Sequence, residues 1–167
     1  MSRLKECSIN FEGAWENATD CATIAIINGP NINILGIREP DFYGKELWTD
    51  IELRLKKKAA EVGVNLLFFQ SNHEGLIVDF IQENLKRING IVINPAAYTK
   101  TGYAILDAIT SIDIPFVEVH ISNIYERGGW HSDSIFAEKA LGQIVGFKGF
   151  GYDLGLMAIS DFIKNKS

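Results

Sequence analysis

The stretch IAIINGPNINILGIREPDFYG, from Ile24 to Gly44, decides how the fold of this chain is read. It begins with the apolar, mostly β-branched residues Ile24 to Ile27, which are typical of a buried strand. The turn-forming cluster Asn28-Gly29-Pro30-Asn31 ends that strand, and a long segment without a regular period follows. A loop of this kind is usually functional or disordered, and open α/β sheets bind ligands at the carboxyl ends of their strands. Because the loop carries amides, a guanidinium and a phenol, we expect it to form part of a site.

Short apolar segments alternate with helical patterns along the rest of the chain. Strands are predicted at residues 24–27, 65–70, 91–94, 116–120 and 144–147, and helices at 47–62, 74–87, from about 101, and 152–164. This alternation predicts a parallel sheet covered on both faces, in an α/β fold. Right-handed crossovers in one small domain favour the flavodoxin-like, doubly wound strand order 2-1-3-4-5. In this order the loops after the first, third and fourth strands converge.

Local signals place the ends and inner faces of the helices. Leu47 and Leu85 fall on the inner faces of the helices at 47–62 and 74–87. Gly63 is expected to end the first of these helices, and Ser71-Asn72 to cap the second. Residues 1–22 have no regular pattern and are predicted to be an N-terminal extension of a single flavodoxin-like domain at 23–167.

Composition narrows the class of protein. The net charge of −5 is spread along the chain, which argues against nucleic acid or a membrane surface as a main partner. Neither a membrane span nor a signal or transit peptide is indicated. Cys7 and Cys21, interpreted as free thiols, fit a reducing cytosol, so we expect a cytoplasmic protein.

Common cofactor and metal motifs are missing from the sequence. There is no GxGxxG after the first strand, no P-loop, no CxxC, and no histidine pair at metal-ligand spacing, so no metal site is predicted. A flavin or phosphate site at the first loop is disfavoured because Pro30 removes an N–H donor there.

The remaining polar residues form a candidate acid and base pair. Tyr43 is the candidate base, and Arg38 in the same loop would favour its phenolate. His120 is the candidate acid, and Glu118, on the same face of its strand, would hold the ring in one tautomer. By residue type alone, a surface tyrosine beside an arginine and a histidine at a strand end remain alternative readings. Neutral donors suited to a carboxylate or hydroxyl are offered by Asn94 and Ser122.

Several ordered motifs, together spanning about residues 23–160, resemble those of type II 3-dehydroquinate dehydratases. The motifs are Asn28-Gly29-Pro30-Asn31, Leu35-Gly36, Arg38-Glu39-Pro40, Tyr43-Gly44, FQSNHEG at 69–75, GIVINPAAYT at 90–99, VEVHISN at 117–123, GQIVG at 142–146, and Gly151-Tyr152. These enzymes eliminate water from 3-dehydroquinate to give 3-dehydroshikimate, a step of the shikimate pathway of aromatic amino acid biosynthesis. They use no cofactor, and the elimination is anti and runs through an enolate.

The resemblance implies roles for individual residues. Tyr43 would remove the proton next to the ketone with its pKa lowered by Arg38, and Asn31 would hold a water that stabilises the enolate. His120, supported by Glu118, would protonate the leaving hydroxyl.

The resemblance also implies substrate contacts, a lid and an assembly. The loop from Gly36 to Gly44 would close over the substrate, and family members are dodecamers of four trimers. Asp107 matches an acid that reaches the neighbouring subunit's site. The predicted carboxylate contacts are Asn94, Ile121 and Ser122, and Ala96 in the loop after the third strand is a further predicted substrate contact.

Two positions depart from the family pattern. Lys100 stands where the family usually has histidine, and His131 stands where it usually has arginine. Both family residues contact ring hydroxyls, so the two changes either compensate for each other or mark a paralogue that uses the same mechanism on a different cyclic hydroxy acid. A non-catalytic binding protein is the third reading.

Overall fold

The structure, a computed structural model, describes residues 21–36, 46–127 and 133–166. Its centre is a parallel five-stranded sheet in the order β2-β1-β3-β4-β5. The predicted flavodoxin-like order is therefore confirmed. The strands are β1 (Thr23–Asn28), β2 (Asn65–Gln70), β3 (Gly90–Asn94), β4 (Phe116–His120) and β5 (Gly142–Val145).

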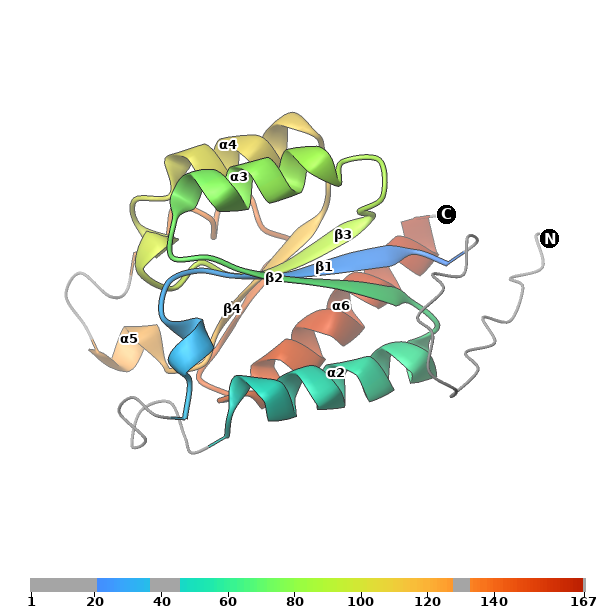
Figure 1. Ribbon diagram of the computed structural model, residues 1–167, viewed down its shortest axis with the longest axis horizontal. Coiled ribbons are helices and arrows are strands. Elements are labelled where there is room, and N and C mark those ends of the chain that lie inside the picture. The colour runs from blue at the N-terminus through green and yellow to red at the C-terminus, as the bar shows by residue number, and fades with distance from the viewer. Residues whose placement is uncertain (1–20, 37–45, 128–132, 167) are drawn as a thin grey trace.

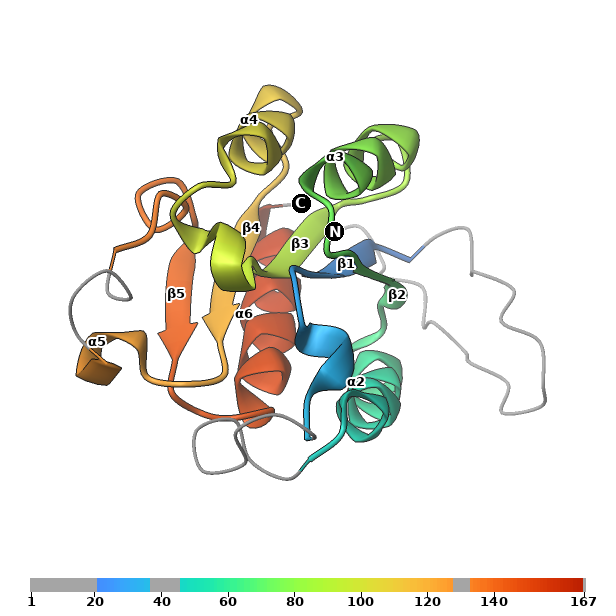
Figure 2. The same cartoon turned by 60° about the vertical axis from the view of Figure 1, so that its left-hand side comes forward.

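Helices cover both faces of the sheet, as Figures 1 and 2 show. On one face lie α2 (Trp48–Val62) and α6 (Phe150–Lys166), and on the other lie α3 (Glu74–Glu83) and α4 (Tyr103–Ser111). Three short elements occupy loops after strands: η1 (Ile32–Ile34), η2 (Ala96–Thr99) and α5 (Ile124–Arg127).

The sequence of β1 is continuously apolar because both faces of the strand are buried. Ile24 and Ile26 pack into the core beneath α2 and α6, whereas Ala25 and Ile27 pack into the core beneath α3 and α4. Successive strand residues point to opposite faces, and both faces are covered here, so no position can be polar without a partner. The strand ends at the first buried polar side chain, Asn28.

The ends of α2 follow from local chemistry. Gly63 adopts a left-handed conformation with φ 68° and ends the helix, as predicted. The helix begins at Trp48, because the Asp50 carboxylate accepts a hydrogen bond from the backbone N–H of Leu47. The prediction that Leu47 faces inward is wrong, since it precedes the helix and is exposed.

Helix α3 is shorter than predicted. Its N-cap residue is His73, which makes no side-chain capping bond, so the expected cap by Ser71-Asn72 is wrong. At the other end the Asn84 side chain donates to the Phe80 carbonyl at 2.9 Å and the helix stops at Glu83. Leu85 consequently lies beyond the helix and is exposed, contrary to the prediction.

The last strand and helix also differ from their predicted bounds. β5 covers Gly142–Val145 because the Leu141 N–H pairs with the Phe116 carbonyl at 2.8 Å and Gly146, with φ 91°, turns the chain away. Phe147 therefore lies outside the strand and is exposed. Helix α6 starts at Phe150, two residues earlier than predicted.

The state of Cys21 bears on the expected compartment. The prediction of a free thiol is wrong for Cys21, which is disulfide-bonded, so this residue does not support a reducing cytosol. None of the helices in the described ranges is both long and apolar enough to cross a bilayer.

Candidate active site

The strands β1, β3 and β4 end side by side with polar residues. Asn28 on β1 is in register with Asn94 on β3, and Glu118 on β4 is in register with Ile93 on β3. Figure 2 shows η1 and η2 at this edge of the sheet. The predicted convergence of the three loops is thus present in the described residues.

The exits of β1 and β3 are in direct contact. The Gly29 N–H donates to the Asn94 carbonyl at 2.8 Å. A Cβ atom at Gly29 would lie 2.2 Å from the carbonyl oxygen of Pro95, so only glycine permits this approach. Ala96, just beyond, adopts a left-handed φ of 52°, a conformation that non-glycine residues seldom adopt. The neighbouring residues therefore hold the backbone of Ala96 in this left-handed conformation.

The loop after β1 is held by Asn72, which was predicted to cap the following helix. Asn31 has a left-handed φ of 68° and its backbone N–H donates to the side-chain oxygen of Asn72 at 3.0 Å. The same oxygen accepts from Gln70 at 3.1 Å, and the backbone carbonyl of Asn72 accepts from the Tyr98 hydroxyl at 2.7 Å. Asn72 therefore links the loops after β1, β2 and β3. The side chain of Asn31 is exposed at this edge.

A buried hydrogen-bonded group lies beneath the edge. The Tyr152 hydroxyl donates to Asn28 Oδ1 at 2.7 Å and accepts from Asn94 Nδ2 at 2.9 Å. Burial raises the pKa of the Tyr152 phenol well above its usual range, so the hydroxyl remains a neutral donor. The other end of the Asn94 amide, Oδ1, accepts from the Ala96 N–H at 3.2 Å. The Asn94 side chain is thereby fixed in orientation.

His120 and Glu118 form a buried pair. His120 Nε2 lies 2.8 Å from Glu118 Oε1, and the two side chains are 5% and 0% exposed. Ser134 Oγ donates to the same oxygen at 2.7 Å, and Gln143 Nε2 donates to Glu118 Oε2 at 2.8 Å. Sequence reasoning did not single out Ser134 or Gln143.

The loop that follows His120 is also well held. The carbonyl oxygens of His120 and Ile121 accept the backbone N–H groups of Gly146 and Lys148, at 3.1 and 2.9 Å. Ser122 is buried next in the chain, before α5 begins. The peptide segment after β4 is therefore fixed against the segment after β5.

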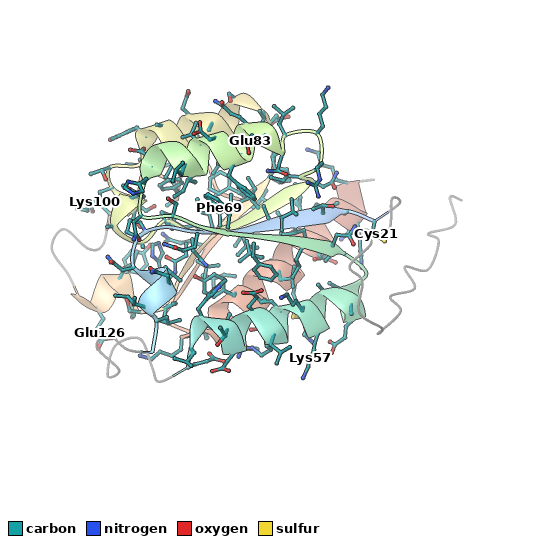
Figure 3. All side chains as sticks on the ribbon, in the orientation of Figure 1. Cys21, Lys57, Phe69, Glu83, Lys100 and Glu126 are labelled. Carbon is teal, nitrogen blue, oxygen red and sulfur yellow. The ribbon has the colours of Figure 1, made fainter. Side chains whose placement is uncertain are left out.

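Lys100, one of the two departures from the family pattern, is paired. Its Nζ lies 2.9 Å from Asp133 Oδ2. Nearby, the Ile135 N–H donates to the Thr99 carbonyl at 3.0 Å. Figure 3 shows Lys100 at the end of the molecule opposite Cys21, which precedes β1. Lys100 thus lies at the end where the parallel strands finish.

One of the remaining predicted site residues lies on a helix, and three lie outside the described residues. Asp107 is exposed on α4, where its carbonyl accepts from Thr110 Oγ1 at 3.2 Å. Arg38, Tyr43 and His131 lie outside the described residues. Within residues 21–36, 46–127 and 133–166, no group of three His, Cys, Asp or Glu side chains is placed to hold a metal ion.

Comparison with known proteins gives the family. A family model described as "Dehydroquinase class II" matches residues 22–160. This chain belongs to the class II dehydroquinase family. The resemblance seen in the sequence is confirmed, and with it the prediction of an enzyme of the hydro-lyase class.

Individual class II dehydroquinases are similar to this chain over most of their length. The chain is 49% identical to a protein of Prochlorococcus marinus named "3-dehydroquinate dehydratase", over 86% of this chain and 98% of that protein. It is 46% identical to a "Catabolic 3-dehydroquinase" of Aspergillus oryzae, over 86% of this chain and 94% of that protein. The crystal structure of the type II dehydroquinase of Butyrivibrio crossotus matches with a TM-score of 0.79 and 42% identity, over 86% of this chain and 98% of that one.

Proposed function

We propose that this protein dehydrates 3-dehydroquinate to 3-dehydroshikimate. The observation that carries the proposal is the buried His120–Glu118 pair at the carboxyl end of β4, in a chain of the class II dehydroquinase family. An imidazole held by a buried carboxylate at the ligand-binding edge of an α/β sheet is suited to proton transfer. The names of the relatives support 3-dehydroquinate as the substrate.

The proposed reaction has two proton transfers on opposite faces of the substrate ring. The Tyr43 phenolate, favoured by Arg38, takes a proton from the carbon next to the ketone and leaves an enolate. A water held by the exposed Asn31 side chain stabilises the enolate oxygen. His120 then gives a proton to the departing hydroxyl, which leaves as water while the enolate electrons form the carbon–carbon double bond. The roles of Tyr43 and Arg38 rest on the motif match.

Neutral donors at the edge are proposed to bind the substrate carboxylate. The Nδ2 group of Asn94 has two hydrogens, and the bond to Tyr152 uses one of them. The second is available to a ligand, with its direction fixed by the bonds at both ends of the amide. Ala96, Ile121 and Ser122 contribute contacts from the adjoining loops. Lys100 and His131 are proposed to contact the ring hydroxyls.

Further elements of the proposal follow the family. We propose that residues 36–44 form a lid and that residues 23–167 form the catalytic domain behind an extension at 1–22. The match of the family model from residue 22 supports this division. We also propose assembly into trimers and dodecamers. Asp107 is exposed on α4, where a neighbouring copy could reach it, and this supports the assembly.

A steady-state assay with 3-dehydroquinate tests the proposal, because formation of the conjugated enone is followed by ultraviolet absorbance. We expect turnover by the unaltered chain and a loss of about 10²-fold to 10⁴-fold for Tyr43→Phe and for His120→Ala. Tyr103→Phe, which changes an exposed tyrosine on α4, is the matched control and should keep full activity. Absence of enone at high enzyme concentration would overturn the assigned reaction.

A further inference from the structure

Glu118 is surrounded by hydrogen-bond partners from three different parts of the chain. It is fully buried near the end of β4. Its Oε1 atom lies 2.8 Å from His120 Nε2 and 2.7 Å from Ser134 Oγ, and its Oε2 atom lies 2.8 Å from Gln143 Nε2. Such a group is stable in the interior only if donors and acceptors match. The direction of each bond therefore carries information about protonation.

The direction of the Ser134 bond is set by its other partners. Ser134 Oγ accepts the backbone N–H of Phe136 at 3.1 Å and that of Ala137 at 3.3 Å. A hydroxyl has two lone pairs and one hydrogen, so accepting two bonds leaves its hydrogen for Glu118. Ser134 is therefore a donor to the carboxylate.

The direction of the Gln143 bond is set by the partner at the other end of its side-chain amide. Gln143 Oε1 accepts a hydrogen bond from the Tyr125 hydroxyl, which turns Nε2 of the same amide toward Glu118. Gln143 also stands next to Glu118 in the sheet, because the two residues are in register between β5 and β4. Gln143 is therefore a second fixed donor.

These directions determine the protonation of the histidine. Donors on both oxygens stabilise the ionised carboxylate of Glu118, and in that form it only accepts hydrogen bonds. His120 Nε2 must then carry a hydrogen and donate it to Oε1. The neutral ring consequently has its lone pair on Nδ1, and Nδ1 is the atom that gains and gives up the exchangeable proton.

We propose that Ser134 and Gln143 are positioning residues that fix Glu118, and thereby hold His120 in the tautomer with hydrogen on Nε2 and with Nδ1 toward the substrate. Tyr125 extends this chain of contacts. The inference rests on the proposed function for its consequence in catalysis, but the tautomer can be measured without turnover. The simpler alternative is that Ser134 only stabilises its own turn and Gln143 only stabilises the strand pair.

The experiment measures imidazole ¹⁵N chemical shifts by long-range ¹H–¹⁵N NMR on the full chain. The chain has three histidines, so variants of His73 and His131 assign the His120 signals. We expect neutral His120 to show the Nε2–H tautomer. Combining Ser134→Ala with Gln143→Met should give mixed tautomers and lower kcat on 3-dehydroquinate about 10-fold to 100-fold, with KM changed less than about 3-fold. Ser134→Thr keeps the hydroxyl and should restore both readouts.

The matched control is Ser160→Ala in α6. Ser160 is 3% exposed and its Oγ donates to the Leu156 carbonyl at 2.6 Å, so this change removes a buried hydroxyl that is not joined to Glu118. It should leave the His120 tautomer and kcat unchanged. A similar loss of kcat in Ser160→Ala would mean that general destabilisation explains the Ser134 effect.

Two results would overturn the inference. The first is an Nδ1–H tautomer of His120 in the unaltered protein, which requires no variant to fold. The second is a folded double variant in which both the tautomer and kcat stay within twofold of the unaltered protein. If the double variant does not fold, Tyr125→Phe, at an exposed residue whose hydroxyl donates to Gln143, should still shift the tautomer toward a mixture. A tautomer shift in a chain without dehydratase activity would uphold the positioning and reject the proposed function.

Discussion

Lys100 Nζ and Asp133 Oδ2 lie 2.9 Å apart and join the loop after β3 to the segment that leads to Ser134. The two side chains are 27% and 79% exposed, so the pair contributes little to stability, about 0 to 1 kcal/mol. Its consequence is therefore expected in ligand binding, because the pair fixes where the ammonium group stands relative to the site.

A double-mutant cycle tests this role. We predict that Lys100→Met and Asp133→Asn each raise the KM for 3-dehydroquinate by about 3-fold to 10-fold, whereas the melting temperature changes by less than about 2 °C. The double variant should resemble Lys100→Met, because without the ammonium group the change at Asp133 has nothing left to position. Strictly additive effects on KM would show that Lys100 acts without Asp133.

Tyr152 allows a prediction about stability and pH. Tyr152→Phe removes the hydroxyl that donates to Asn28 and accepts from Asn94, and it should lower the free energy of unfolding by about 1 to 3 kcal/mol. Burial raises the pKa of Tyr152 in the folded state, whereas an unfolded tyrosine titrates near pH 10. Above that pH the unfolded chain loses a proton that the folded chain keeps, so stability falls as pH rises.

Denaturant titrations between pH 8 and 11 measure this effect. Above pH 10 the free energy of unfolding of the unaltered protein should fall by up to about 1.4 kcal/mol more per pH unit than that of Tyr152→Phe. Tyr103→Phe is the control, because Tyr103 is 66% exposed and the change removes a tyrosine hydroxyl that lies outside the buried group. Equal slopes for the Tyr152→Phe variant and the unaltered protein would mean that the Tyr152 hydroxyl is accessible to water.

Gly29 tests the close approach of the β1 and β3 exits. An added Cβ would lie 2.2 Å from the Pro95 carbonyl oxygen. Because that oxygen belongs to the backbone, the clash could be relieved only by moving the backbone. We predict that Gly29→Ala lowers stability by about 2 kcal/mol or more and reduces kcat/KM.

Gly75→Ala, in α3, is the matched control for Gly29. A Cβ there meets nothing within 4 Å, so the change should stabilise the helix by about 0.5 to 1 kcal/mol. Thermal unfolding and the enone assay measure both variants. Equal melting temperatures for the two would contradict the packing described at the strand exits.

The sequence predicted the parts of the fold that depend on periodic patterns. The strand order and the meeting of Asn28 with Asn94 follow from apolar runs and from the topology of parallel sheets. The short elements η1, η2 and α5 were not predicted, because each depends on local backbone bonds instead of a repeating apolar face. A left-handed conformation at Asn31 or Ala96 likewise has no periodic signal.

The surroundings of Glu118 were predicted in part. His120 shares its face of β4 through the period of two residues, and this was foreseen. Gln143 was missed because β5 was placed two residues too late, which hid its register with Glu118. Ser134 lies in an irregular segment, where a contact across 16 residues has no sequence pattern.

The central claim is that a base and the His120 acid act on opposite faces of one ring. It is tested most directly with 3-dehydroquinate carrying deuterium at one or the other position of the acidic carbon next to the ketone, with mass spectrometry of the 3-dehydroshikimate formed. We predict that the label anti to the leaving hydroxyl is lost and the syn label is retained. Loss of the syn label would contradict the account.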